Sequence, residues 1–168
     1  MEIFTQFVGF VAVGFSIAVF QKNKRRTMLI LASIAAFLYA GHFFFLEAYT
    51  GAAMNLLGAV RCLIFLKVSP QKANIWILYL FLGLGFIATI VTWQSWYSLL
   101  SLLGASLYAI STWQSTPKMI RRFSLAAPPF WFSYNALAGS YPGMLIEVLI
   151  FASIILGRYR FDRSVTKK

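Results

Sequence analysis

Four polar side chains with useful chemistry lie inside apolar stretches of this 168-residue chain. Asn55 and Asn135 carry amides, which both donate and accept hydrogen bonds. Glu147 carries a carboxyl group, and His42 can take up or release a proton near neutral pH. Such groups can bind a small polar molecule. Each also has a plainer interpretation, because an amide or a histidine can simply join two helices and Glu147 can form a structural ion pair.

Three aromatic side chains accompany these polar groups in the same apolar stretches: Tyr39, Trp131 and Tyr134. Aromatic rings can stack on the flat face of a sugar or a heterocycle, and they also serve as ordinary packing residues. Together with the four polar side chains, they are the predicted substrate-binding residues.

Other kinds of chemistry find little support in the sequence. The chain has one histidine and one cysteine, so neither a metal site nor a cofactor is expected. It lacks a glycine-rich phosphate loop with a following Lys and Ser or Thr. Any catalytic triad would depend on His42, and no suitable serine and acid accompany it. We therefore expect a protein that is not an enzyme, with an intramembrane enzyme as the weakest alternative.

The elements that hold these residues are expected to be membrane-spanning helices. The chain is 60% apolar and 11% charged, against about 25% charged in ordinary globular domains, and its mean hydropathy is +0.75. Segments in a bilayer must satisfy their own backbone hydrogen bonds, which favours helices. The first segment is expected to be retained rather than cleaved as a signal peptide. The seven predicted segments are residues 3–20, 27–46, 50–66, 75–93, 96–113, 123–139 and 141–157.

The cations predict the orientation of these segments. The net charge is +11, and every Lys or Arg except Arg61 falls in residues 22–26, 67–72, 118–122 or 158–168. These stretches follow segments one, three, five and seven, so they share one side of the membrane. The positive-inside rule places that side in the cytoplasm and the N-terminus outside. A role in nucleic-acid binding is not expected.

Five of the seven candidate residues share one layer, somewhat outside the midplane, when the segments are set across a bilayer. Asn55 and Glu147 stand five and six residues from the outer ends of their segments, about 7–9 Å of helical rise. Tyr39 and Trp131 lie closer to the middle of the membrane. The other three reach the level of Asn55 from the outer halves of segments two and six: His42, Tyr134 and Asn135.

Arg61 is the one cation inside a predicted segment. It lies six residues beyond Asn55, towards the cytoplasmic side. Three interpretations remain open: its side chain extends to the inner headgroups, it pairs with Glu147 in the core, or it binds an anionic group of the substrate.

Segments one to three and five to seven resemble each other. Residues 38–55 align with residues 130–147 at a shift of 92 positions, although identity is low. A tandem pair of three-helix units keeps one orientation if a single helix separates them. The predicted organisation is therefore 3+1+3: a first repeat at 1–67, a linker helix at 68–94, a second repeat at 95–157 and a basic tail at 158–168. The aligned pairs include Tyr39 with Trp131, His42 with Tyr134, Gly51 with Gly143 and Asn55 with Glu147.

This plan resembles the SWEET, MtN3 and PQ-loop superfamily of membrane proteins. The ending WFSYNALAGSYPGMLIEVLIFASIILGRYRFD, residues 131–162, resembles the bacterial inner-membrane YgjV family more closely. The resemblance implies an all-α, multi-pass protein of the inner membrane, built as two parallel three-helix bundles. It also implies transport of a small polar solute by alternating access, with a sugar or sugar acid as the first expectation and a vitamin precursor as the next.

Pro128 and Pro129 interrupt the predicted sixth segment and are the candidate gating residues. The matching stretch of segment two, residues 33–36, contains no proline, so a proline hinge would belong to the second repeat alone. A static bend is the alternative.

The expected partners are the lipid bilayer and a small-molecule solute, with a homodimer as an option. The rival function is a noncatalytic membrane partner or regulator, in which the polar layer serves only helix association.

Overall fold

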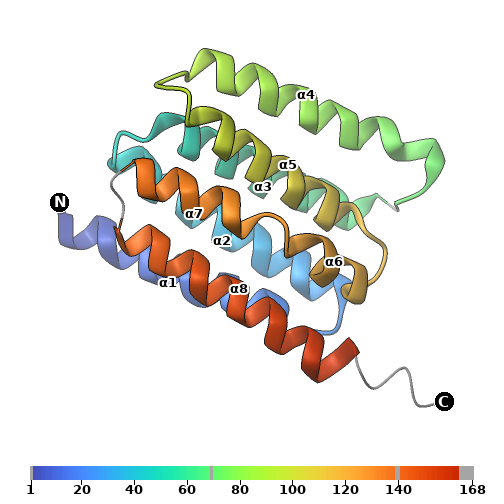
Figure 1. Ribbon diagram of the computed structural model, residues 1–168. Coiled ribbons are helices and arrows are strands. Elements are labelled where there is room, and N and C mark those ends of the chain that lie inside the picture. The colour runs from blue at the N-terminus through green and yellow to red at the C-terminus, as the bar shows by residue number, and fades with distance from the viewer. Residues whose placement is uncertain (1, 69, 139–140, 163–168) are drawn as a thin grey trace.

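The computed structural model describes residues 2–68, 70–138 and 141–162, and these residues form only helices and their connections. Figure 1 shows the long α-helices side by side, with neighbours in the chain running in opposite directions, while α6 and α7 follow one another in the same direction. The all-α prediction is therefore confirmed for the described residues. The helices are α1 (Glu2–Phe20), α2 (Arg25–Phe45), α3 (Tyr49–Lys67), α4 (Ile75–Val91), α5 (Ser98–Trp113), α6 (Pro117–Ser124), α7 (Pro128–Leu137) and α8 (Tyr141–Asp162), with a 3-10 turn η1 (Lys72–Asn74) before α4.

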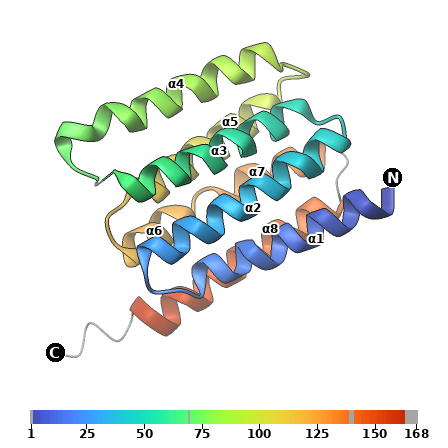
Figure 2. The ribbon, with the colours of Figure 1, turned by 180° about the vertical axis from the view of Figure 1, so that it is seen from behind.

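The helices form two rows with one helix outside them. In the first row, α2 packs against both α1 and α3. In the second, α6 and α7 together pack against both α5 and α8. The rows meet through α3 with α5 and through α1 with α8. Helix α4 packs on α3 and α5 and lies at the edge of the bundle opposite α1 and α8, as the front and back views both show (Figures 1 and 2).

The predicted sixth segment is two helices rather than one kinked helix. Helix α6 ends at Ser124, and α7 begins with Pro128 and Pro129 at its first two positions. A proline inside a helix removes a hydrogen-bond donor and clashes with the preceding turn, but it is well suited to the first turn of a new helix. The prediction of a continuous helix across residues 123–139 was therefore wrong, while the interruption by the two prolines is confirmed.

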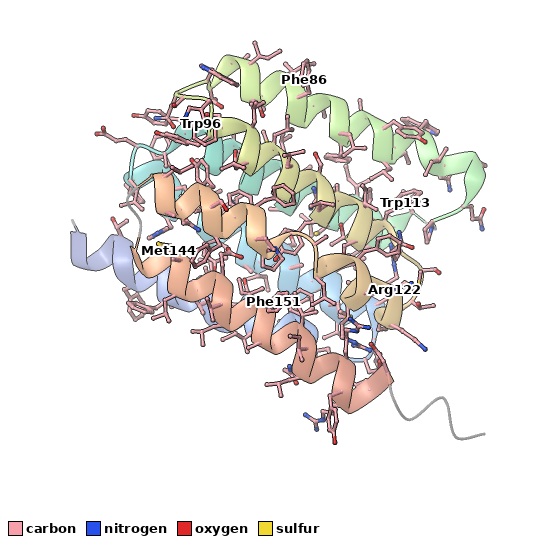
Figure 3. All side chains as sticks on the ribbon, in the orientation of Figure 1. Phe86, Trp96, Trp113, Arg122, Met144 and Phe151 are labelled. Atoms are coloured by element: carbon pink, nitrogen blue, oxygen red, sulfur yellow. The ribbon has the colours of Figure 1, made fainter. Side chains whose placement is uncertain are left out.

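All described cation-bearing connections lie at one end of the bundle, which we call the basic end. It comprises residues 22–26, 67, 118–122 and 158–160, where α1, α3, α5 and α8 finish and α2 and α6 begin. Arg122 marks this end in Figure 3, and Trp96 marks the opposite end. The two ends therefore differ in charge, as the loop pattern predicts.

The outer surface of the bundle is apolar. Phe37, Phe86 and Leu156 are each more than half exposed, and Phe86 lies on α4 at the rim of the molecule (Figure 3). By length and composition, α2 and α3 are apolar enough to cross a membrane. Three further apolar stretches in the described residues are shorter: Phe7–Phe20, Ile75–Val91 and Ser98–Trp113. A surface of this kind fits an α-helical membrane protein, because lipid rather than water can cover it.

Candidate functional site

A cavity of about 130 Å³ lies inside the bundle. Its wall contains residues from α1, α2, α3, α5, α6, α7 and α8, while none of the described residues of α4 reaches it. Both rows of helices therefore contribute to a single space. The wall is largely apolar, with a few polar groups placed among Met, Ile and Ala side chains, which is the usual makeup of a small-molecule site.

Most of the residues predicted to bind substrate line this cavity. The count of helical rise predicted five of the seven at one level and the other two nearer the middle of the membrane, and the structure brings six of the seven around one space. Asn55, from the third helix of the first row, and Glu147, from the last helix of the second, both contribute. The predicted residues that line the cavity are Tyr39, His42, Asn55, Trp131, Asn135 and Glu147.

Tyr134 does not line the cavity. Its side chain is fully buried behind the wall and makes edge-on contacts with Phe43, Tyr97 and Trp131, at ring-centre distances of 6.3, 5.8 and 5.7 Å. The structure thus places Tyr134 as a support for the cavity wall. Its neighbour Asn135, one residue further around the helix, points into the space instead.

His42 is held in place from helix α1. Its Nδ1 lies 2.9 Å from the backbone oxygen of Thr5. A carbonyl oxygen can only accept, so Nδ1 donates in this contact. The imidazole ring can pack against α1 because residue 9 is glycine. A Cβ atom at Gly9 would lie 2.9 Å from the ring, which is too close. The histidine is therefore a helix-joining residue whose ring also forms part of the cavity wall.

Trp131 and Asn55 are also fixed by their neighbours. A Cβ atom at Gly104 would lie 2.6 Å from the Trp131 indole, so only glycine allows the ring to pack there. The indole stacks on Phe43 with ring centres 6.1 Å apart. Asn55 Nδ2 donates to the oxygen of Gly51 at 2.9 Å. Its amide is thus oriented, because its donor is held by its own helix.

The cavity is surrounded by polar atoms that lack a protein partner. Of the described side chains, only five have a buried nitrogen or oxygen without a hydrogen bond from the protein. Buried polar atoms are nearly always hydrogen-bonded, so a cluster of exceptions needs an explanation. Four of the five residues line the cavity, and Tyr134 stands directly behind it. The four atoms are Tyr39 Oη, Arg61 Nε, Asn135 Oδ1 and Glu147 Oε2.

Arg61 is a cavity residue that does not reach the headgroups. Its side chain is 7% exposed, and it donates to the oxygen of Ala105 on α5 at 3.4 Å. It forms no ion pair with Glu147 either, since the only pair within 4.0 Å among described residues joins Arg121 and Asp162. Two of the three interpretations of Arg61 were therefore wrong, namely extension to the headgroups and pairing in the core.

Two arginines at the basic end of the bundle join the rows of helices, although the sequence predicted both to be simple loop cations. The Arg121 side chain on α6 is 1% exposed and pairs with Asp162 on α8. It also donates to the oxygen of Lys22, at 2.9 Å, and to Asn23 Oδ1, at 3.2 Å, in the connection between α1 and α2. Arg121 therefore joins the two rows of helices.

Arg25 makes the reverse connection from the start of α2. It donates to the oxygen of Gln114 at 2.8 Å, just after α5, and to the oxygen of Phe65 at 2.9 Å, on α3. We call Arg25 and Arg121, with these partners, the arginine latch. The sequence offered one signal for it: Asp162 is the single acid among the basic C-terminal residues.

Comparison with known proteins identifies the family. The model of the Imp-YgjV family, described as bacterial inner membrane protein, matches residues 3–165. The chain belongs to this family. The match covers nearly the whole chain and confirms both the resemblance to YgjV and the inner-membrane location. No curated protein and no solved structure matches this member of the family.

Proposed function

We propose that this family member is a transporter that moves a small polar solute through the space between two three-helix units. The units are α1–α3 and α5–α8, with α6 and α7 counting as one broken helix and α4 as the linker of a 3+1+3 plan. Seven segments would cross the membrane, with the N-terminus outside and the basic end in the cytoplasm, following the distribution of cations. The protein would act without chemistry on its solute.

The contacts between helices support an internal repeat. Exchanging α1 with α5, α2 with α6 and α7, and α3 with α8 converts each contact within one row into a contact within the other. The same exchange converts the contact of α3 with α5 into that of α8 with α1. Two copies of one unit, related by an axis along the membrane normal, would produce this pattern. Helix α4 has no counterpart in the exchange, as expected of a linker.

The observation that carries the proposal is the set of unpartnered polar atoms around the cavity. Arg61 Nε comes from the first unit, and Asn135 Oδ1 and Glu147 Oε2 come from the second. If polar groups served only to join helices, as in the rival partner or regulator hypothesis, they would bond to one another across the interface. Unpartnered groups facing a shared space are better explained by a polar occupant that crosses it.

The arginine latch supports alternating access. It ties the two units together at the basic end. Arg25 of the first unit donates to the oxygen of Gln114, just after α5. Arg121 of the second unit donates to the oxygen of Lys22 and to Asn23 Oδ1. The break between α6 and α7, next to Pro128 and Pro129, lies in the second unit beside the cavity. Ser124, the last residue of α6, and Trp131 in α7 both line the cavity. When the latch is closed, solute would exchange at the opposite end. When it opens, the units would move apart at the basic end.

The test is uptake by purified protein in proteoliposomes, with a mixed pool of small polar solutes analysed by mass spectrometry. Asn55→Ala and Glu147→Gln should each reduce uptake at least tenfold. Leu56→Ala and Val148→Ala are matched controls, because these neighbours are 49% and 53% exposed on the outer surface and should leave uptake unchanged. Uptake of no solute, or equal loss in control and cavity variants, would contradict the proposal.

A further inference from the structure

The cavity holds an acidic and a basic side chain that are not paired with each other. Glu147 is 9% exposed and Arg61 is 7% exposed, and both line the same space. Neither belongs to the only ion pair found among the described residues. An unpaired buried charge is strongly unfavourable, and inside a membrane such residues usually mark a substrate or ion pathway. A folded protein that keeps both ionisable groups unpaired therefore has another use for them.

The unpartnered atoms divide by type as well as by position. Glu147 Oε2 and Asn135 Oδ1 are acceptors that lack a donor, and both come from the second unit. Arg61 Nε is a donor that lacks an acceptor, and it comes from the first unit. Tyr39 Oη can act in either way. The cavity thus offers acceptors on one side and a guanidinium on the other.

The two sides also differ in depth. Glu147 lies six residues after the start of α8, and Arg61 lies twelve residues after the start of α3 at the same end of the bundle. At 1.5 Å per residue, their backbone positions differ by about 9 Å along the helices. The guanidinium therefore stands towards the basic end and the carboxyl group towards the opposite end. A solute that bridges the two groups through a hydrogen bond at each end needs unlike groups at those ends.

We infer that the solute is a small zwitterion, with a carboxylate that binds Arg61 and an ammonium group that binds Glu147 and Asn135. This inference rests on the proposed transport function and specifies its substrate class. Carboxylates match the planar guanidinium well, and an ammonium group supplies three donors for the two unpartnered acceptors. Trp131 and Tyr39 line the remaining space and can contact the apolar part of the solute.

The size of the cavity restricts the choice further. Its volume of about 130 Å³ is below the roughly 300–1,000 Å³ typical of pockets for drug-sized ligands. A short amino acid fits this limit better than a large one. A sugar offers hydroxyl groups at both ends and would leave the guanidinium without an anion. The zwitterion is therefore preferred over the sugar or vitamin precursor that the superfamily resemblance suggests.

The first experiment measures binding to the purified full-length protein in detergent. The probes are glycine, L-alanine and L-serine, compared with propionate, ethylamine and glucose. We expect a rise in the thermal unfolding midpoint with the amino acids and a clearly smaller one with the other three. Arg61→Gln and Glu147→Gln should each weaken amino-acid binding at least tenfold, while Arg61→Lys should retain part of it. The exposed neighbour Val60→Ala should bind normally.

A readout without ligand separates a binding role from a structural one. Because each charge is unpaired, Arg61→Gln and Glu147→Gln should leave the unfolding midpoint of the free protein unchanged or higher. A lower midpoint in both variants would show that the charges stabilise the fold and would overturn the inference. Equal binding of propionate and alanine, binding of none of the three amino acids, or unchanged amino-acid binding in Arg61→Gln would overturn it as well.

Uptake experiments distinguish failure of this inference from failure of the proposed function. Glucose uptake that is lost in Asn55→Ala but intact in Arg61→Gln would overturn the zwitterion and leave a transporter. Amino-acid binding without uptake of any solute would overturn the transporter. Uptake of alanine that requires both Arg61 and Glu147 supports the two together.

Discussion

Replacing Arg121 with methionine should open the basic end of the bundle. The Arg121 side chain is 1% exposed, and that of its partner Asp162 is 10% exposed. Methionine keeps much of the apolar length of arginine but removes the ion pair and the bonds to Lys22 and Asn23. These bonds connect the two units, so the closed arrangement loses stability relative to one in which the units separate at this end.

The expected magnitude follows from the two hydrogen bonds that Arg121 makes to the first unit. A hydrogen bond to a charged group contributes about 1.5–3 kcal/mol. We take the lower figure for each of the two bonds, about 3 kcal/mol in all. Since about 1.4 kcal/mol corresponds to a factor of ten, the population open at the basic end should rise roughly 100-fold.

The chain supplies its own reporter for this change. Cys62 is the only cysteine, it is 2% exposed, and it lines the cavity. The assay is the rate at which a membrane-impermeant thiol reagent labels Cys62 in inside-out vesicles, where the reagent meets the basic end in the proposed topology. Labelling should be slow in the wild type and up to about 100-fold faster in Arg121→Met. Reagent applied at the opposite end should label the variant more slowly than the wild type.

Arg122→Met is the matched control. Arg122 is the adjacent cation, and its side chain is exposed. This control should label at the wild-type rate. Labelling of Arg121→Met within threefold of the control, in protein that remains folded by thermal unfolding, would refute the latch. Faster labelling from both sides at once would indicate general loosening rather than a gate, and would refute it too.

Two further predictions concern stability, each measured as the thermal unfolding midpoint of purified protein in detergent. Gly157→Ala should lower the midpoint by an amount equivalent to about 1–3 kcal/mol, because the new Cβ would clash with the backbone oxygen of Phe20. Gly83→Ala is the control and should not lower the midpoint, because no atom lies within 4 Å of the position of its new Cβ. Equal midpoints for the two alanine variants would contradict the close packing of α1 on α8. Ser111→Ala should cost about 1–2 kcal/mol, since the hydroxyl lies 2.6 Å from Ser124 Oγ and joins α5 to α6, and a change below 0.3 kcal/mol would count against this contact.

The sequence predicted the helices, and which residues lie at similar levels along the bundle, because both depend on local quantities. Apolar length sets where a helix can lie in a bilayer, and a fixed rise per residue converts position into depth. This placed Asn55 and Glu147 beside one cavity. It did not fix rotation about the helix axis, since a helix that is apolar on most sides gives a weak facing signal. Tyr134 was accordingly placed in the site when only its neighbour Asn135 faces the cavity.

The latch was missed for a different reason. Arg121 and Asp162 are 41 residues apart, and a cation in a basic connection is usually solvated. Nothing local distinguishes Arg121, which is buried, from Arg122, which is exposed. The break before Pro128 was likewise read as a bend, because the position of two prolines does not reveal whether the chain continues the old helix or begins a new one.

The central claim is that one cavity, bounded by both units, communicates with each side of the membrane in turn. Asn55→Cys in a Cys62→Ser background tests it most directly, because the new thiol replaces a cavity-lining amide and is the only one in the chain. Membrane-impermeant thiol reagent applied separately to right-side-out and inside-out vesicles should label residue 55 from both sides. Labelling of folded protein from one side alone, or from neither side, would contradict the account.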